Sequence, residues 1–371
     1  MRVALVHDWL NQMGGAEKTL LSMAEVFPNA PIYTSIYDPD RLNQTFKALD
    51  IRTSFMQRLP FVKKHHQPFL PLYPFAMESL DLRGYDLVVS GSSAFAKGVI
   101  TRPDTLHVCY CYTPMRWAWG FQDYIERERI GKAARLALAP FINWLRLWDY
   151  STAARVDAFI AISPIVAARI AKYYRRESVI IPPPVDVQRF QVSTRREDYF
   201  LIVSRLIPYK RIDLAVRAFT KLGLPLRIVG GGRDESSLRK LAGPTVRFMG
   251  RLSDEQVREQ LAGCRAFIFP GEEDFGIAPV EAQACGKPVI AYGAGGALST
   301  VVEGVTGLFF REQTVDSLAN VVASFRDELF NPLTIRRHAE QFDTSLFKER
   351  LAQYVATRYT ASRGYNATQS R

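Results

Sequence analysis

The segment from Ala266 to Gly293 reads AFIFPGEEDFGIAPVEAQACGKPVIAYG. It begins with a short apolar run, AFIFP, and ends with another, PVIAY. Between them lies a loop, followed by a helix-like stretch that begins near Phe275–Ile277. Two buried strands joined by a helix form the βαβ unit of a parallel sheet. The segment therefore predicts an α/β domain built around a parallel sheet.

The same alternation of apolar runs and helical stretches occurs twice along the chain. Nearly continuous runs of Val, Ile, Leu and Phe are typical of parallel strands that are covered on both faces. The first set comprises residues 2–7, 31–36, 86–91, 106–112, 157–163 and 178–184, and the second comprises 199–204, 226–231, 246–250, 266–270, 288–292 and 307–310. Two sets predict two Rossmann-like, doubly wound parallel-sheet domains that face a cleft.

The domain boundary is predicted from a linker at 182–198, which is rich in proline and then in polar residues. We expect an N-terminal domain at 1–190 and a C-terminal domain at 191–345. Residues 346–371 are expected to form a helix that packs back on the N-terminal domain and ends in a polar tail.

Composition restricts the class of protein. The chain has 371 residues, 47% hydrophobic and 23% charged, which is typical of a soluble globular protein. The net charge of +11 favours an anionic partner, but the charge is spread over both halves without a basic block, so no nucleic-acid partner is expected. The cysteines form no C-x-x-C pair, the chain starts with a strand-like run, and no apolar run reaches the ~18 residues of a membrane span. We therefore expect a cytoplasmic protein without a signal peptide.

Loops that follow predicted strands carry the residues expected to bind anions. Arg205 and Lys210 follow the first strand of the second set, where two cations suit a diphosphate, although a solvated surface loop fits equally well. Gly14 and Gly15 follow the first strand of the chain and let backbone amides approach an anion, or they belong to an ordinary βα loop. The lack of a G-x-G-x-x-G motif in this loop argues against NAD.

The opening segment concentrates four carboxylates in a basic chain. Glu273 lies in the loop and Glu281 lies in the helix, and this spacing allows both to face one pocket. Carboxylates accept hydrogen bonds from the hydroxyls of sugar and ribose rings, and amides at the helix start suit a phosphate. The pattern predicts a nucleotide-sugar site. The alternative is that acids near a helix start only complement the helix dipole, which explains one acid but not three. Glu272 and Asp274 are assigned to helix-terminus charge and to solvation of the loop.

The motifs SRLIPYK, IVGGG, FMGRLS and GEEDFGIAPVEAQACGKPVIAYGAGG, in this order, resemble the donor-binding half of glycosyltransferase family 4, whose members have the two-domain GT-B fold. HDWLNQMGGAEK and YCYTPMRWAW resemble bacterial members that add mannose or related sugars during polysaccharide assembly. The resemblance implies a retaining, metal-independent hexosyltransferase without a cofactor, with GDP-mannose as the expected co-substrate.

By this resemblance, Glu273, Arg205 and Lys210 are the catalytic set: Glu273 binds the donor sugar and the two cations bind its diphosphate. Glu281 is expected to bind the ribose. The donor-binding residues implied are Gly14, Gly15, Ser204, Gly230, Gly250, Arg251, Leu252, Phe275, Gly276, Ile277 and Glu281.

One position departs from the pattern of the family. Related sequences often have a histidine where this chain has Tyr112, and tyrosine can donate a hydrogen bond but does not become a cation near neutral pH. A catalytic imidazole is therefore in doubt at this position. His7, Tyr112 and Arg116 are the expected contacts of the sugar or the acceptor, and a structural role for His7 fits as well.

The resemblance implies that the C-terminal domain binds the nucleotide-sugar donor and the N-terminal domain binds the acceptor. The acceptor is expected to be a saccharide or a polyprenyl-diphosphate-linked sugar. Segments 52–77 and 131–150 combine cations with aromatic residues, which predicts peripheral binding to the anionic inner face of the plasma membrane; a domain core with solvated charges fits nearly as well. Three other functions remain open: a transferase that uses a UDP-sugar, a GT-B nucleotide-sugar epimerase, and a non-catalytic nucleotide-sugar-binding partner.

Overall fold

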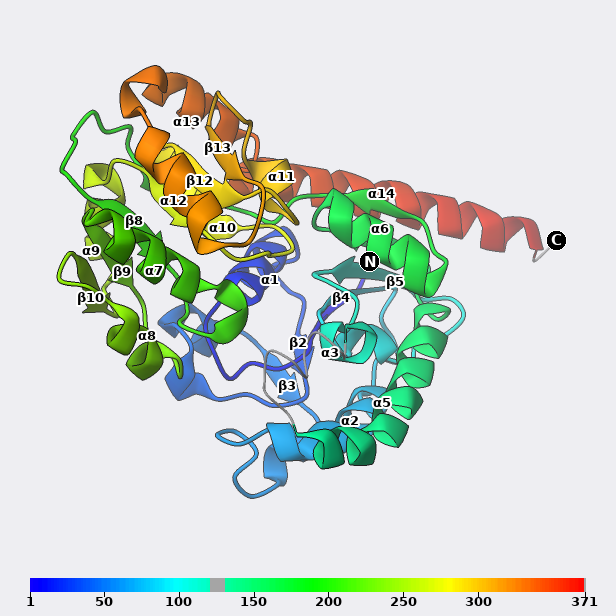
Figure 1. Ribbon diagram of the computed structural model, residues 1–371. Helices are drawn as coiled ribbons and strands as arrows, with labels where there is room; N and C mark the ends of the chain where they lie inside the picture. The colour runs from blue at the N-terminus through cyan, green and yellow to red at the C-terminus, as the bar shows by residue number, and fades with distance from the viewer. Residues whose placement is uncertain (121–130, 370–371) are drawn as a thin grey trace. The chain divides into compact units, whose positions relative to one another are not determined.

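The computed structural model describes residues 1–120 and 131–369, apart from the side chains of 132–134 and 364–369. The chain forms two compact units (Figure 1): unit 1 comprises Met1–Pro184 and Ser345–Arg371, and unit 2 comprises Val185–Thr344. The division falls a few residues before the predicted boundary at 190. It does so because Val185 already pairs with unit 2, where its N–H donates to the carbonyl of Phe342 at 2.9 Å. Residues 370–371 of the predicted tail lie outside the described residues.

Unit 1 contains a seven-stranded parallel sheet with the strand order β3-β2-β1-β4-β5-β6-β7. Its strands are β1 (Val3–His7), β2 (Ile32–Thr34), β3 (Ile51–Thr53), β4 (Leu87–Ser92), β5 (Leu106–Cys111), β6 (Ala158–Ala161) and β7 (Ser178–Ile180). Its α-helices are α1 (Gly15–Val26), α2 (Tyr73–Glu78), α3 (Arg116–Trp119), α5 (Lys132–Ala153), α6 (Pro164–Tyr174) and α14 (Thr344–Gln369). Short 3₁₀ helices are η1 (Pro39–Arg41), η2 (Gln44–Ala48), η3 (Phe55–Arg58), η4 (Gln67–Leu72) and η5 (Ala96–Gly98).

Unit 2 contains a six-stranded parallel sheet with the order β10-β9-β8-β11-β12-β13. Its strands are β8 (Phe200–Val203), β9 (Leu226–Val229), β10 (Val246–Gly250), β11 (Phe267–Phe269), β12 (Val289–Tyr292) and β13 (Gly307–Phe310). Its helices are α7 (Ile212–Leu222), α8 (Glu235–Leu241), α9 (Asp254–Gly263), α10 (Ile277–Ala284), α11 (Ala297–Thr300), α12 (Val315–Ser324), α13 (Pro332–Glu340), η6 (Val187–Arg189), η7 (Pro208–Lys210) and η8 (Asp327–Leu329).

The predicted class, two parallel-sheet α/β domains, is confirmed. Each apolar run of both predicted sets overlaps one strand, because the central strands are buried on both faces, as β4 and β5 are throughout their length. The sequence missed β3. This strand has three residues, with the exposed Arg52 in its middle, so it lacks the apolar run that marks a buried strand.

The strand orders place one topological switch point in each sheet. In unit 1 the order reverses between β1 and β4, and in unit 2 it reverses between β8 and β11. Ligands of open α/β sheets bind where the loops leave such a pair of strands in opposite directions, at their carboxyl ends. We therefore expect ligand-binding sites at these two switch points.

Helix α14 makes polar and aromatic contacts with the rest of unit 1. Lys348 Nζ lies 2.9 Å from Glu25 Oε2, Arg363 Nη2 lies 2.9 Å from Asp86 Oδ1, and the ring of Phe347 meets the ring of Tyr110 edge-on at 5.6 Å. Among the described residues, no helix combines the length and the apolar character needed to cross a membrane.

Candidate active site

The switch point of unit 2 brings together three residues of the predicted catalytic and donor-binding set. The chain leaves β8 at Ser204 and turns through η7, which ends at Lys210, while the loop after β11 carries Glu273. A small pocket at this point is lined by Ser204, Lys210 and Glu273, together with backbone and apolar side chains of β8 and β11. The fold therefore places the predicted cation and the predicted carboxylate at the same switch point.

Lys210 and Glu273 form an ion pair between Nζ and Oε1. The exposed fractions of their side chains are 12% and 22%, so the pair is partly shielded from water. Charges in such a place interact more strongly than surface charges do. Each of the two groups is thus held by the other at the position where a diphosphate and a sugar are expected to bind.

Tyr209, which the sequence analysis did not single out, lies beside both predicted cations. Arg205 is exposed, and its Nη2 donates to the Tyr209 hydroxyl at 3.4 Å. Lys210 Nζ lies 5.2 Å from the centre of the Tyr209 ring, within the range of a cation–π contact. Both cations of the loop are therefore oriented by one aromatic side chain.

The backbone that carries Glu273 is fixed by Gly296, another residue that the sequence analysis missed. The N–H of Gly296 donates to the carbonyl of Glu273 at 2.7 Å, and a Cβ at position 296 would collide with the backbone of Phe275. Phe275 is buried and meets Phe342 edge-on at 5.4 Å. The signal in the sequence was the Gly-Ala-Gly-Gly that follows the strand at 288–292.

Helix α10 begins at Ile277, with Gly276 as its N-cap, within the range where the sequence predicted a helix start. Glu281 lies about one turn further and is half-buried. It is not among the described residues that line the pocket at Lys210 and Glu273. Glu273 and Glu281 were expected to face one pocket, but only Glu273 lines this small pocket.

A second group of predicted donor-binding residues lies at the carboxyl ends of β9 and β10. The N–H of Gly230 donates to the carbonyl of Gly250 at 2.7 Å, and the N–H of Ser204 donates to the carbonyl of Val229 at 3.0 Å. Arg251 and Leu252 follow directly and lead into the capping box of α9. These hydrogen bonds connect the loops that leave β8, β9 and β10.

In unit 1, the switch point holds a nearly buried pair formed by His7 and Glu17. His7 Nε2 and Glu17 Oε1 are 3.8 Å apart, and both side chains are 3% exposed. Gly14 is the N-cap of α1, which starts at Gly15. No described residue hydrogen-bonds to the buried Nδ1 of His7.

Tyr112 is engaged within unit 1. Its hydroxyl donates to the carbonyl of Ala16 at 3.0 Å, and its ring meets His7 edge-on at 6.2 Å. Burial raises the pKa of Tyr112 well above its usual value, so the side chain stays a neutral phenol. Its hydroxyl proton thereby fixes the first turn of α1, next to the predicted glycine loop.

Arg116, the third expected contact of the sugar or acceptor, is the first residue of α3 and is half-buried. The predicted residues thus form separate groups. Two groups lie in unit 2, at the β8/β11 switch point and at the ends of β9 and β10, and His7, Tyr112 and Arg116 lie in unit 1. Among the described residues, no cluster of three or more His, Cys, Asp or Glu side chains is placed to hold a metal ion.

Comparison with known families agrees with the two-domain fold. A family model described as Glycosyltransferase Family 4 matches residues 13–189, and a model described as Glycosyl transferases group 1 matches residues 186–331. Consecutive matches over both sheets, together with the two switch points, define a glycosyltransferase with the GT-B architecture. The chain belongs to glycosyltransferase family 4.

Named relatives include mannosyltransferases. The chain is 34% identical over 178 residues to the GDP-mannose-dependent monoacylated alpha-(1-6)-phosphatidylinositol monomannoside mannosyltransferase of Corynebacterium glutamicum, a match that covers 40% of this chain and 46% of the relative. It is 26% identical to human alpha-1,3/1,6-mannosyltransferase ALG2, over 92% of this chain and 93% of the relative. The first of these matches spans less than half of the relative's length. Matches to the D-inositol 3-phosphate glycosyltransferases of Actinosynnema mirum and Geodermatophilus obscurus span 64% and 53% of those relatives.

A solved structure of the same fold is that of Anabaena HepE in complex with UDP and glucose. Its TM-score is 0.70 at 17% sequence identity, and the superposition covers 96% of this chain and 99% of that one. At this level of identity the likeness concerns the fold.

Proposed function

We propose that this protein transfers mannose from GDP-mannose, with retention of anomeric configuration, to a saccharide or polyprenyl-diphosphate-linked acceptor in the assembly of a cell-surface polysaccharide. The observation that carries the proposal is the Lys210–Glu273 pair at the β8/β11 switch point. A cation there suits the diphosphate of a nucleotide sugar, and a carboxylate beside it suits the hydroxyls of the sugar. The mannosyltransferase names of two relatives support mannose as the sugar.

In the proposed reaction, the bond between the anomeric carbon and the donor's phosphate oxygen breaks while a bond to the acceptor oxygen forms. The acceptor's proton moves to the departing phosphate oxygen. Arg205, Lys210 and the backbone amides of Phe275–Ile277 stabilise the negative charge that grows on the leaving diphosphate. Donors aimed at developing charge commonly contribute the largest catalytic effect. No residue of this scheme requires a metal ion.

The role of Glu273 separates two versions of the mechanism. In the first, its carboxylate holds the sugar and orients Lys210; in the second, it attacks the anomeric carbon and forms a glycosyl-enzyme intermediate. Glu273→Gln keeps the shape and can accept hydrogen bonds, but it is a poor nucleophile. Residual turnover of this variant supports the first version, trapping of a glycosylated wild-type enzyme supports the second, and full activity of Glu273→Ala excludes both.

The donor is tested by the thermal stability of the protein with GDP, UDP and ADP and with their sugars. A ligand that binds more tightly at equal concentration raises the melting temperature more. We expect GDP-mannose to give the largest shift. A larger shift with UDP-glucose favours the alternative of a UDP-sugar-dependent transferase. HepE, which has the same fold, was solved in complex with UDP and glucose. Epimerisation of a nucleotide sugar without acceptor favours the epimerase, and binding without turnover of either kind favours the non-catalytic partner.

We also propose that unit 1 binds an anionic membrane surface where the acceptor is expected. Large apolar side chains are exposed in the two segments singled out from the sequence, among them Phe61 (78%), Phe75 (57%), Leu136 (77%) and Leu147 (63%). Phe75 and Trp144 stack at 6.5 Å, so α2 and α5 contribute to one surface. Exposed apolar groups beside cations suit an interface with anionic lipid. The side chain of Lys132, one of the cations of the segment 131–150, lies outside the described residues.

Sedimentation with vesicles that contain phosphatidylglycerol tests the membrane proposal. We expect the protein to sediment with these vesicles at low salt and the double variant Leu136→Ser/Leu147→Ser to remain in the supernatant. Leu329→Ser/Leu333→Ser is the matched control, because these two leucines are exposed in unit 2. A wild-type protein that stays in the supernatant contradicts this proposal without affecting the proposed transfer reaction.

A further inference from the structure

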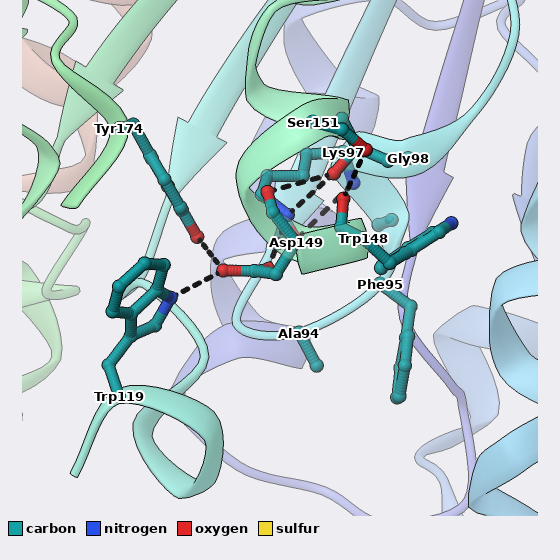
Figure 2. A network of polar contacts seen from close by, with 12 residues as sticks. Ala94, Phe95, Lys97, Gly98, Trp119, Trp148, Asp149, Ser151 and Tyr174 are labelled. Carbon is teal, nitrogen blue, oxygen red and sulfur yellow. Dashed lines mark hydrogen bonds and ion pairs between the residues drawn. The ribbon is translucent and has the colours of Figure 1, made fainter. Parts of the chain in front are cut away.

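A buried network of polar contacts in unit 1 centres on Asp149 of α5 (Figure 2). Asp149 is fully buried, and Lys97 is 1% exposed. Lys97 Nζ lies 2.5 Å from Asp149 Oδ1, while the indole N–H of Trp119 and the hydroxyl of Tyr174 donate to Oδ2 at 2.7 and 2.9 Å. One carboxylate thus binds three donors that come from three different elements of the fold.

The first element is the loop after β4, which carries Lys97. The backbone N–H groups of Ser93, Ala94, Phe95 and Ala96 all donate to the carboxylate of Asp8, the residue directly after β1. Gly98 packs so closely on α5 that a Cβ there would collide with the Trp148 ring. The loop is therefore fixed at the β1/β4 switch point on one side and at α5 on the other.

The second element is α3, which has four residues and begins with Arg116. A helix of one turn is not stable without tertiary contacts. Besides the bond from Trp119 to Asp149, Arg146 of α5 donates to the carbonyl of Ala118 from Nη2 at 2.7 Å and from Nε at 3.1 Å. Asp149 and Arg146 lie one turn apart on the same face of α5. Asp149 binds a side chain of α3, that of Trp119, and Arg146 binds the backbone of α3 at Ala118.

Stability alone is a weak explanation for this network. Replacing a buried ion pair with apolar side chains of similar volume is often neutral or stabilising, because desolvation offsets the attraction. Apolar packing has no preferred direction, whereas hydrogen bonds depend on the angle between donor and acceptor. The bonds to Asp149 therefore fix the orientation of the groups that donate to it. Two of the three elements that it joins leave the carboxyl edge of the sheet, after β4 and after β5, and the third donor, Tyr174, is the last residue of α6.

We propose that Asp149 is a positioning residue for the transfer reaction. Its Oδ1 holds the loop after β4 through Lys97, and its Oδ2 holds α3 through Trp119, which fixes the place of Arg116 at the carboxyl edge of the first sheet. The link to catalysis rests on the proposed function, whereas the placement of α3 rests on the hydrogen bonds described above.

Substitution of Asp149 itself is a poor test, because it leaves the charge of Lys97 buried without a partner and can prevent folding. Trp119→Phe and Tyr174→Phe form a matched pair. Each removes one neutral donor from the same carboxylate oxygen and keeps an aromatic ring, but Trp119 belongs to α3 and Tyr174 ends α6. Trp119→Phe also reduces the ring that stacks on Tyr173 at 4.7 Å, so it is expected to lose more stability. If Asp149 acts by positioning α3, the two variants will differ in activity under conditions where both are fully folded.

The experiment measures transfer rates, hydrogen exchange and nucleotide binding in the full-length protein. We expect Trp119→Phe to lower the transfer rate on the order of tenfold to a hundredfold, as misplacement of a reacting group can do, and to speed amide exchange in residues 113–119. Tyr174→Phe is expected to stay near wild type in both. The thermal shift with GDP is expected to be the same in all three proteins, since the predicted diphosphate and ribose ligands Arg205, Lys210 and Glu281 lie in unit 2.

Equal losses of activity in the two variants overturn the proposal, because the network then contributes stability alone. Unchanged exchange at residues 113–119 in Trp119→Phe also overturns it, as does faster exchange with unchanged transfer. A wild-type protein that transfers no sugar contradicts the proposed function and, with it, the catalytic link. In that case the exchange measurement still decides whether Asp149 fixes α3.

Discussion

Lys210 and Glu273 neutralise each other at the switch point of unit 2. A diphosphate that binds to Lys210 therefore competes with a carboxylate that is already there, and a sugar whose hydroxyls bind to Glu273 relieves that competition. A complete nucleotide sugar satisfies both charges, whereas a bare nucleotide satisfies one. With the donor bound as proposed, we therefore expect the pair to favour the intact donor over its product.

The first prediction concerns Lys210→Ala. We expect the transfer rate to fall about 10²–10³-fold, because one preorganised donor to the leaving group is lost. The matched control is Lys221→Ala, which breaks the exposed pair between Lys221 Nζ and Asp316 Oδ1 and should leave the rate unchanged. The measurement is the initial rate at saturating donor. Similar rates for the two variants would show that Lys210 has no part in the reaction.

The second prediction concerns pH. Burial lowers the pKa of His107 to about 4 in the folded protein, and its Nε2 lies 2.8 Å from Ser90 Oγ. The unfolded chain binds this proton near pH 6.5, so the free energy of unfolding falls as the pH drops from about 6.5 to 4, by about 3 kcal/mol in total.

Burial also lowers the pKa values of His66 and His338, which contribute in the same direction. Urea unfolding at pH 7 and pH 4.5 measures the loss of stability on acidification. His107→Gln, which keeps a polar partner for Ser90, should lose less than the wild type. An equal loss in both proteins would contradict the assignment to His107.

At the scale of elements, the apolar runs predicted most of both sheets because a strand buried on both faces requires such a run. The sequence missed β3, whose three residues include an exposed arginine. It also missed Tyr209 and Gly296. The role of Gly296 depends on contacts with Glu273 and Phe275 in another loop, which the spacing of residues in one segment does not encode. Tyr209 contacts Arg205 and Lys210 in its own loop, and these contacts depend on the turn that η7 makes there. The pairing of Lys210 with Glu273 joins two loops that are distant in sequence, so the sequence predicted both residues but not their bond.

The third prediction concerns the loop between β11 and α10. Gly296→Ala places a methyl group against the backbone of Phe275 and should shift the loop that carries Glu273. We expect the protein to lose about 1–3 kcal/mol of stability and most of its binding of nucleotide sugar. Gly131→Ala is the control, because no atom of the residues that the structure describes lies within 4 Å of a Cβ at this position. Isothermal titration with the donor would contradict the prediction if both variants bound it like the wild type.

At the scale of the whole molecule, unit 2 is inserted between β7 and α14 of unit 1. The N–H of Val185 donates to the carbonyl of Phe342 at 2.9 Å, and the N–H of Thr344 donates to the carbonyl of Val185 at 3.1 Å. The first and last residues of unit 2 are therefore neighbours. Unit 2 also has its own buried cores on the two sides of its sheet.

The fourth prediction is that residues 185–344 fold without the rest of the chain. We expect a single cooperative transition in urea, because the fragment keeps its sheet, its cores and the pairing of its two ends. A shorter fragment, 185–331, lacks Ile335 and Ala339 of the core and the pairing at Phe342, and it should be much less stable. Circular dichroism during unfolding distinguishes the two. A non-cooperative transition of the longer fragment would show that unit 2 depends on unit 1.

The neighbouring ends of unit 2 also affect how such a protein can change during evolution. A recombination event with breakpoints at the codons for Val185 and Thr344 exchanges one whole sheet with its helices and leaves the hydrogen bonds within the other sheet intact. The incoming segment needs only ends that lie as close together as these two. The gene can therefore acquire a new unit 2 in one step, while the unit that contains α3, α5 and Asp149 is inherited unchanged.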